Sequence, residues 1–268
     1  MMNADSFARL EAVVARVGVA VRDGAAAIRV VPDSIDAENP TTDLDRRADE
    51  MLCSGLLAEL GAGVAYLSEE RADDPARLGA SRVLIVDPID GTRNLVRGLG
   101  EAAVSVALWR DGTLAWAAVH NPFSGEMFTA TAGGGAWRGG QRLVVTSCAD
   151  VSRARLVVSR HETERGLLAG IEARVACRPV GSIAYKMALV AAGEADGTVT
   201  AWTRHEWDIA AGTLLVREAG GIVTDAAGLD VEFNRPDTAL RGVVVSNGKL
   251  HAGLLGLVRT LRPATSAG

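Results

Sequence analysis

The 268-residue sequence is poor in cysteine and in aromatic side chains. Its three cysteines, Cys53, Cys148 and Cys177, are odd in number and widely spaced, and none belongs to a Cys-x-x-Cys pair. This pattern argues against both a disulfide framework and a thiolate zinc site. Aromatic residues make up only 4% of the chain, whereas hydrophobic residues make up 48%. The core is therefore expected to be built mainly from Ala, Val and Leu.

The sequence also lacks a charge-free apolar run of about 20 residues, the length that a membrane helix needs. Its N-terminus has no basic segment followed by an apolar run, so we expect no secretory signal. The net charge is −5, and no cluster of Lys and Arg marks a nucleic-acid surface. These absences argue against membrane and nucleic-acid partners, and the acidity suits a cytoplasmic enzyme that binds cations.

The first half of the chain predicts two helices followed by an antiparallel sheet. Apolar residues recur at helical spacing over residues 5–29 and 43–60. Residues 30–40, which include two prolines, are expected to connect these helices. Residues 102–130 have the pattern of a hairpin and a further strand, and the antiparallel sheet is expected to end near residue 147.

The second half predicts short strands that alternate with helices, which is typical of α/β architecture. The helices are expected over residues 162–170, after Gly181-Ser182 to about residue 192, over 207–219 and over 249–261. We therefore expect a mixed α/β fold with two subdomains. Residues 1–147 would hold the main metal-binding motif, and residues 148–268 would complete the active site.

The strongest motif follows the branched apolar run Val83 to Val86, which predicts a buried strand. This run leads directly into Asp87-Pro88-Ile89-Asp90-Gly91-Thr92. Two carboxylates at the end of a buried strand are costly unless a cation compensates them, and Mg²⁺ takes oxygen ligands while leaving positions for phosphate. Thr92 is expected to cap a following helix, whose free N–H groups would face that phosphate. An ordinary acidic turn is the simpler alternative.

Two other segments place a carboxylate at the end of a strand or the start of a helix. Glu69 follows the predicted strand 64–67, and Asp208 stands where the helix 207–219 begins. Taken singly, Glu69 is better explained as a loop residue and Asp208 as an N-cap. Taken with Asp87 and Asp90 they make four carboxylates, enough to hold two or three Mg²⁺ ions.

The motifs Asp87 to Thr92 and Trp207 to Gly212 resemble the two signatures of the inositol monophosphatase family, which comprises Mg²⁺-dependent, lithium-sensitive phosphatases. The resemblance covers nearly the whole chain, since it extends through residues 39–45, 68–70, 125–143, 218–221 and 246–248. It implies a layered α-β-α-β-α sandwich of the inositol monophosphatase and fructose-1,6-bisphosphatase type, commonly a homodimer. The expected activity is that of a metal-dependent phosphoric monoester hydrolase.

The resemblance also implies the roles of individual residues. The metal ligands would be Glu69, Asp87, Asp90, Asp208 and the carbonyl of Ile89. Glu69, together with the pair Thr92 and Asp45, would orient a water that one metal activates, and a second metal would stabilise the leaving alkoxide. Gly91, Thr92 and Arg93 would present backbone N–H groups to the phosphate. Since no Ser, Cys or His nucleophile is needed, the four histidines are expected to have surface or structural roles.

The residues that would select the substrate point mainly to a nucleotide with two phosphates. Ala201, seven positions before Asp208, stands where inositol monophosphatases usually carry an acidic residue. Ser68, Arg93 and Lys186 resemble the bacterial 3′(2′),5′-bisphosphate nucleotidases, and a cation would suit a second phosphate. The favoured substrate is therefore 3′(2′)-phosphoadenosine 5′-phosphate.

Four residues are candidates for substrate binding: Gly181, Ser182, Lys186 and Asp208. Lys186 has an equally good explanation as a solvated helix residue. Asn94-Leu95 resembles the inositol enzymes, so inositol-1-monophosphatase remains an alternative, as does histidinol-phosphate phosphatase. A non-catalytic binding module is a distant alternative, because it would predict the loss of at least one metal ligand.

Overall fold

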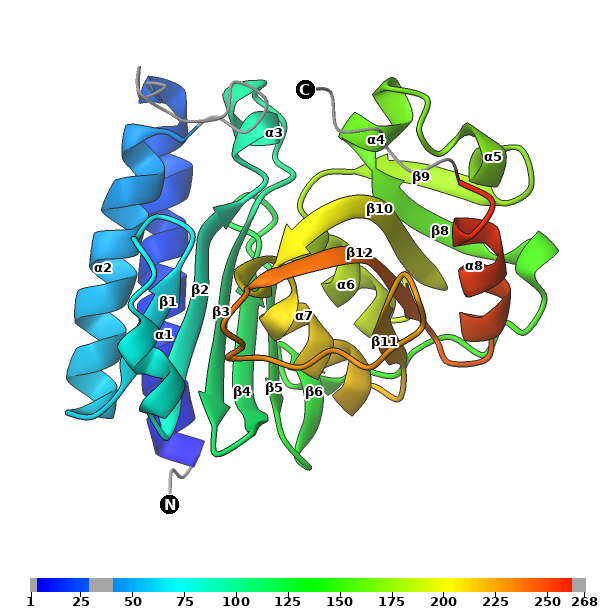
Figure 1. Cartoon of the computed structure of the whole chain (residues 1–268). Coiled ribbons are helices and arrows are strands. Elements are labelled where there is room, and N and C mark those ends of the chain that lie inside the picture. Colours follow the sequence, from blue (N-terminus) through cyan, green and yellow to red (C-terminus); the bar gives the residue numbers. More distant parts are fainter. Residues whose placement is uncertain (1–3, 29–40, 262–268) are drawn as a thin grey trace.

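The computed structural model describes residues 4–28 and 41–261, and it has five layers of alternating helices and sheets (Figure 1). The predicted α/β class and the layered sandwich are confirmed. The expected connector over residues 30–40 lies outside the described residues. Three short 3₁₀ helices complete the described elements: η1 (Ala25–Ala27), η2 (Pro75–Gly79) and η3 (Val151–Arg153).

The first sheet has seven strands in the order of the chain. They are β1 (Ala65–Ser68), β2 (Arg82–Asp90), β3 (Ala103–Arg110), β4 (Thr113–His120), β5 (Met127–Thr131), β6 (Gly135–Arg138) and β7 (Gln141–Arg142). β1 pairs parallel to β2, and every later neighbour pairs antiparallel, as the hairpin pattern predicted.

Two long helices, α1 (Ala4–Gly24) and α2 (Asp43–Leu60), cover the outer face of this sheet. Leu84 and Val86 of β2 belong to the core shared with these helices, whereas Val83 and Ile85 belong to the core on the opposite face. Because both faces of β2 are covered, its residues form a continuous apolar run instead of an alternating pattern.

The middle layer consists of α6 (Ile183–Ala191) and α7 (Glu206–Glu218), which lie between the two sheets. These two helices pack closely at Gly212 of α7. A Cβ atom on Gly212 would lie 2.6 Å from Cβ of Met187 in α6. At the N-terminus of α7, the carbonyl of Trp207 accepts a hydrogen bond from the Ser105 hydroxyl of β3 at 3.4 Å, so this end of the helix lies against the first sheet.

The second sheet has five strands in the order β11-β12-β10-β8-β9. They are β8 (Arg155–Ser159), β9 (Ala176–Val180), β10 (Gly197–His205), β11 (Ile222–Asp225) and β12 (Ala239–Ser246). The pairs β8–β9 and β8–β10 are parallel, whereas β10–β12 and β11–β12 are antiparallel. The sheet is therefore mixed.

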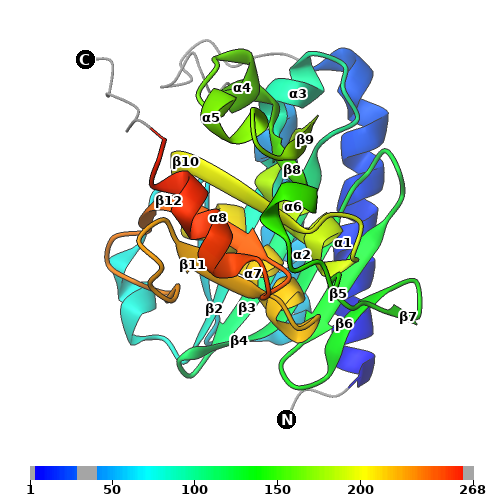
Figure 2. The same ribbon diagram turned by 90° about the vertical axis from the view of Figure 1, so that its right-hand side faces the viewer.

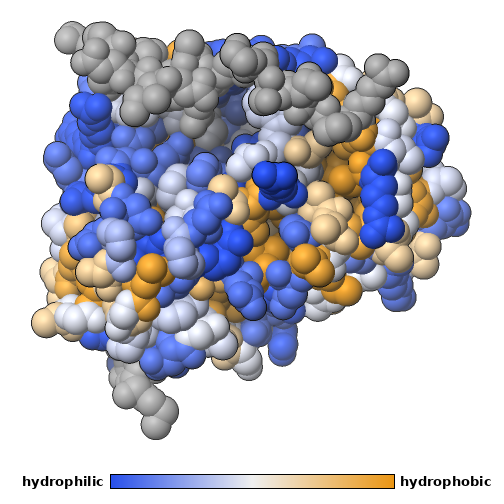
Figure 3. Space-filling model, in the orientation of Figure 1, coloured by the Kyte–Doolittle hydropathy of each residue, from blue (hydrophilic) through white to orange (hydrophobic). Residues whose placement is uncertain are grey.

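The fifth layer contains α4 (Arg160–Glu164), α5 (Ala169–Glu172) and α8 (His251–Val258), seen on the near side in Figure 2. The prediction of one helix over residues 162–170 is wrong, because two short helices are separated around Gly166, whose φ is +69°. On the face drawn in Figure 3, hydrophobic residues lie among hydrophilic ones. No helix in the described part of the chain has the length and apolar character that crossing a membrane requires. The division into subdomains at residue 147 stays a prediction.

Candidate functional site

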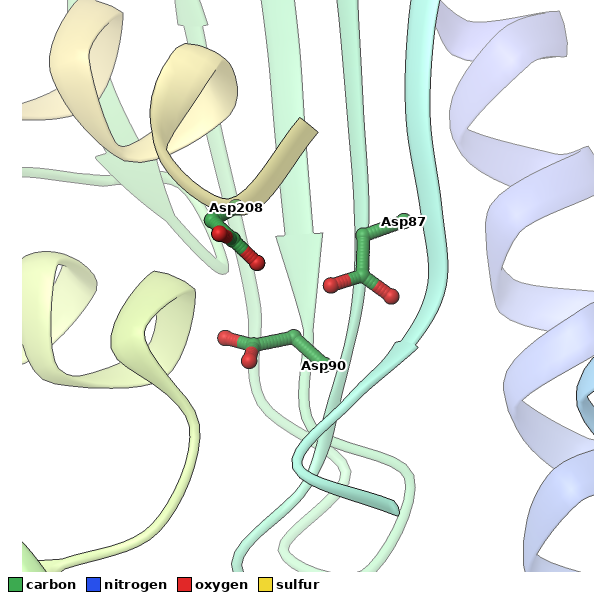
Figure 4. A group of neighbouring side chains, drawn as sticks. All are labelled: Asp87, Asp90 and Asp208. Carbon is green, nitrogen blue, oxygen red and sulfur yellow. The ribbon is translucent and has the colours of Figure 1, made fainter. Parts of the chain in front are cut away.

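The strongest sequence motif lies where β2 ends and α3 (Thr92–Val96) begins. β2 continues through Pro88 to Asp90, but its register with β3 shifts between Asp87 and Asp90. Proline has no N–H to donate to a neighbouring strand, which suits this irregular pairing. Asp87 Oδ1 accepts a hydrogen bond from the backbone N–H of Ile89 at 3.0 Å. In Figure 4 the carboxylates of Asp87 and Asp90 both face the start of α7.

Asp208, the third residue of α7, completes a group of three carboxylates. One of its oxygens, Oδ2, accepts the backbone N–H of His205 at 2.7 Å, as in a capping box. Asp87, Asp90 and Asp208 each offer an oxygen, and these oxygens lie within 4.8 Å of one another (Figure 4). The N-cap of α7 is therefore His205, so the simpler interpretation of Asp208 as an N-cap is wrong. Asp208 instead accepts the N–H of that N-cap residue and also faces the other two carboxylates.

Burial and mutual repulsion disfavour the charged forms of these acids. Burial, followed by the charges of Glu69 and Asp90, raises the pKa of Asp87 well above its usual value. Burial, with a further contribution from Asp90, raises the pKa of Asp208 to about 6. Several carboxylates that share a buried site need compensating positive charge, and an all-oxygen donor set is what Mg²⁺ prefers. The residues present therefore fit a magnesium site.

Glu69 lines the same cavity, directly after β1, but is not part of the 4.8 Å group. Its backbone N–H donates to the carbonyl of Val86 at 3.3 Å. Asp49 of α2 fixes the end of β1, since it accepts hydrogen bonds from Tyr66 at 2.9 Å and Ser68 at 2.7 Å. Burial, then the charge of Asp208, raises the pKa of Glu69 to about 8. Glu69 is thus electrostatically part of the cluster.

Thr92 and Asp45, expected to act as a pair, are in contact. The Thr92 hydroxyl lies 2.7 Å from Asp45 Oδ1 and 2.9 Å from the carbonyl oxygen of Ile89. Asp45 is anchored in turn by the backbone N–H of Thr42 at 2.8 Å, and burial raises its pKa. The expectation that Thr92 caps the next helix is wrong. The residue before α3 is Gly91, with φ +102°, and the Thr92 side chain is turned to Asp45.

A cavity of about 270 Å³ contains the cluster and most of the predicted site. Ile89, Gly91, Thr92, Arg93, Gly181, Ser182 and Lys186 all line it. Lys186 is only 2% exposed, so its interpretation as a solvated surface residue is wrong. Its Nζ donates to the carbonyls of Val180 at 3.2 Å and Ser182 at 3.0 Å, and burial lowers its pKa to about 8. Two of its three N–H donors are therefore used.

Several lining residues were missed in the sequence. They include Ser159, Arg160, His161, Trp202, Thr203, Arg204, His205 and Trp207. Two histidines expected at surface or structural positions thus line the cavity. His161 lies 2.9 Å from Arg93 Nη1 and packs edge-on against Trp202, with ring centroids 4.9 Å apart. The only local signal for Arg204 was its place four residues before Asp208, which does not by itself indicate that the two side chains meet.

Arg204 is the most informative of the missed residues. Its charge lowers the pKa of Asp208 and so opposes the effect of burial. Its Nη2 lies 3.4 Å from the Thr200 hydroxyl, while its Nε is buried without a hydrogen-bond partner among the described residues. This guanidinium therefore places positive charge beside the carboxylate cluster and retains a donor for a further acceptor.

Comparisons with known proteins agree with this geometry. A family model described as "Inositol monophosphatase family" matches residues 4–262. An inositol-1-monophosphatase of Rhizobium meliloti (strain 1021) is 39% identical over 194 residues, which are 69% of this chain and 71% of that protein. A fructose-1,6-bisphosphatase/inositol-1-monophosphatase of Thermotoga maritima is 32% identical over 214 residues, 78% of each chain. The solved structure of a Thermotoga maritima IMPase has a TM-score of 0.82 at 29% identity, covering 93% of this chain and 94% of its own.

Proposed function

Because the chain belongs to the inositol monophosphatase family and is thus a metal-dependent phosphoric monoester hydrolase, we propose that its substrate is a small phosphate ester with a second phosphate. The leading candidate is 3′(2′)-phosphoadenosine 5′-phosphate. The observation that carries this proposal is the charge of the cavity wall beyond the carboxylate cluster.

That wall offers cations and no further acids. Its charged side chains beyond the cluster are Arg93, Arg160, Lys186 and Arg204, and no other Asp or Glu among the described residues lines the cavity. A neutral polyol would need acceptors for its hydroxyl groups, whereas a second phosphate needs donors that carry positive charge. Trp202 adds an aromatic surface against which a nucleobase can stack.

Of the four cations, Lys186 and Arg204 are best placed to bind a second phosphate. Arg93 is engaged with His161, and Arg160 donates two hydrogen bonds to Glu101, at 3.0 and 2.5 Å. Lys186 keeps one donor, and Arg204 keeps its buried Nε. Both lie beside the carboxylates, because their charges affect the pKa of Asp208.

The residues of the cluster would hold Mg²⁺ through the carboxylates of Glu69, Asp87, Asp90 and Asp208 and the carbonyl of Ile89. Bound Mg²⁺ supplies charge neutralisation of the phosphate and activation of water. The Thr92 hydroxyl, donating to Asp45, keeps a lone pair that can accept a hydrogen bond from the attacking water and so orient it. The backbone N–H groups of Gly91, Thr92 and Arg93 would donate to phosphate oxygens as negative charge accumulates there.

The second candidate is an inositol monophosphate. The name of the Rhizobium meliloti relative favours it. Asn94, which resembles the inositol enzymes, also favours it, since this residue lines the cavity. The Thermotoga maritima relative is named both for fructose 1,6-bisphosphate, a sugar with two phosphates, and for inositol 1-phosphate, so its name is compatible with either candidate. The number of Mg²⁺ ions, two or three, the sensitivity to Li⁺, the homodimer and the cytoplasmic location stay predictions.

A phosphate-release screen with Mg²⁺ tests the proposal. The substrates are 3′-phosphoadenosine 5′-phosphate, inositol 1-phosphate, fructose 1,6-bisphosphate and histidinol phosphate, compared by kcat/KM. We expect the highest value for the nucleotide. A higher kcat/KM for inositol 1-phosphate would contradict the proposal and establish the second candidate in its place.

Two variants then locate the second phosphate. Lys186→Met and Arg204→Met keep much of the side-chain volume but remove a charge-assisted hydrogen bond, worth about 1.5–3 kcal/mol or about 10- to 100-fold in KM. We expect the full increase for the nucleotide and a smaller one for inositol 1-phosphate, because both charges also act on Asp208. Arg97→Met is the matched control, because Arg97 pairs with Glu164 on the surface and does not line the cavity.

A further inference from the structure

Ser182 has a backbone conformation that is unusual for its residue type. It immediately precedes α6, with φ +60° and ψ 119°. Among the described residues, Asp111 and Asn234 are the other non-glycine residues with positive φ. Such a conformation costs on the order of 1–3 kcal/mol and persists only where the surroundings hold it. We therefore expect the contacts of Ser182 to stabilise this unfavourable backbone conformation.

The Ser182 hydroxyl joins the first turn of α6 to a predicted metal ligand. It donates to Asp90 Oδ2 at 2.6 Å and accepts the backbone N–H of Tyr185 at 3.0 Å. The same Asp90 oxygen accepts the backbone N–H of Ala184 at 2.6 Å. A carboxylate can only accept, and the Tyr185 N–H occupies a lone pair of the hydroxyl, so the hydroxyl proton points to Asp90.

These contacts are buried and connect the two halves of the chain. Ser182 is 5% exposed and Asp90 8% exposed. The segments approach closely, since a Cβ atom on Gly91 would lie 3.3 Å from the backbone nitrogen of Ser182. An ordinary N-cap serine needs only the bond from Tyr185 and adopts extended backbone angles. The positive φ of Ser182 instead accompanies a hydroxyl that reaches Asp90.

We propose that Ser182 is a positioning residue that fixes Asp90 for metal binding, in place of the substrate-binding role expected from the sequence. With one oxygen held by Ser182 and Ala184, the Asp90 carboxylate keeps the orientation in which it faces Asp87 and Asp208 (Figure 4). The inference rests on the proposed function only in that the carboxylate cluster binds Mg²⁺. Partners of this kind typically contribute about 10- to 100-fold to metal affinity.

Two substitutions separate the hydroxyl from the backbone strain. Ser182→Ala removes the hydroxyl and keeps the unfavourable φ, whereas Ser182→Gly removes the hydroxyl and relieves the strain. We expect both to weaken Mg²⁺ binding by about 10- to 100-fold, measured by calorimetric titration without substrate. We also expect Ser182→Gly to have the higher melting temperature of the two variants. The two would then have similar Mg²⁺ affinities but different melting temperatures, which shows that the affinity depends on the hydroxyl and not on stability.

Ser159→Ala is the matched control. Ser159 also caps a short helix, accepting the N–H of Glu162 at 3.3 Å, and lines the same cavity, but its hydroxyl contacts none of the carboxylates of the cluster. We expect its Kd for Mg²⁺ to stay within about twofold of the wild-type value.

Several results would overturn the inference. They are an unchanged Kd in both Ser182 variants, a Kd that follows the melting temperature, or an unchanged Kd with a raised KM, which would assign Ser182 to the substrate. A wild-type protein that binds no Mg²⁺ would refute both this inference and the metal site. A protein that binds Mg²⁺ but prefers another phosphate ester refutes only the substrate proposal.

Discussion

Removal of the metal should leave a protein whose stability falls as the pH rises from 6.5 to 8. Burial, followed by the charges of Asp208 and Glu70, raises the pKa of Glu69 from 4.5 to about 8. The folded protein therefore retains a proton on Glu69 over a range in which the unfolded chain has released it. Where the folded state binds more protons than the unfolded state, the free energy of unfolding decreases with pH.

The size of this loss of stability follows from the width of the pH range, 6.5 to 8, over which Glu69 keeps its proton in the folded state. Over 1.5 pH units, a difference near one proton corresponds to about 2 kcal/mol, or a fall in Tm of about 4–8 °C for a domain of this size. Burial also lowers the pKa values of His120, His205 and His251 below 6.5, an effect of opposite sign that continues until the unfolded histidines have lost their protons, at about pH 7.5. The lowered pKa of Lys186, about 8, has the same sign as the effect of the histidines and sets in toward pH 8, so both partly offset the fall.

The assay is thermal unfolding at pH 6.5 and 8, with excess chelator or with saturating Mg²⁺. Since Mg²⁺ binds the ionised carboxylates, it should raise Tm and abolish the fall with pH. Glu69→Gln should lose the share of the dependence that Glu69 contributes in chelator, whereas Glu59→Gln, on the outer helix α2, should keep all of it. The raised pKa values of Asp87 and of Glu70, the latter about 7, leave a smaller fall in the Glu69 variant. The reasoning is refuted if the metal-free wild type has the same or a higher Tm at pH 8, or if Glu69→Gln shows the full fall.

Three further predictions concern catalysis. Asp90→Asn should remove activity at ordinary Mg²⁺ concentrations, because Asp90 faces both other carboxylates of the cluster, and wild-type turnover of this variant would contradict the metal assignment. Thr92→Ala should lower kcat by about 10²–10⁴-fold with little change in Tm, whereas an unchanged kcat with a lower Tm would make Thr92 purely structural. Li⁺ should inhibit phosphate release by occupying a metal position, which a titration at fixed Mg²⁺ measures; the absence of inhibition would separate this chain from the lithium-sensitive members of its family.

The features predicted correctly were those in which neighbouring residues encode the structure. The run Val83 to Val86 identified a strand buried on both faces, and the spacing of residues 43–60 identified α2. The carboxylates at element ends could be recognised because a buried acid needs a compensating partner.

The features that were missed depend on how the helices and strands pack and on contacts between distant segments. Lys186 lies on a helix, and only the packing of α6 between two sheets shows that it is buried. Arg204 stands only four residues before Asp208, but the chain passes from β10 into α7 between them, so their spacing did not indicate that their charges interact. The link between Ser182 and Asp90 joins residues 92 positions apart. Local periodicity carries no information about such pairs.

The structure also explains how the fold can keep several acids close together. Asp45, Asp90 and Asp208 each accept a backbone N–H at or beside the first turn of a helix, from Thr42 at α2, Ala184 at α6 and His205 at α7. The N-terminus of a helix carries partial positive charge and unpaired N–H groups, so each of these contacts favours the ionised carboxylate. Burial nevertheless outweighs these contacts, since the pKa values of Asp45 and Asp208 remain raised. The three helices therefore orient the carboxylates without neutralising them, and the remaining deficit of positive charge would favour the binding of a divalent cation at the cluster.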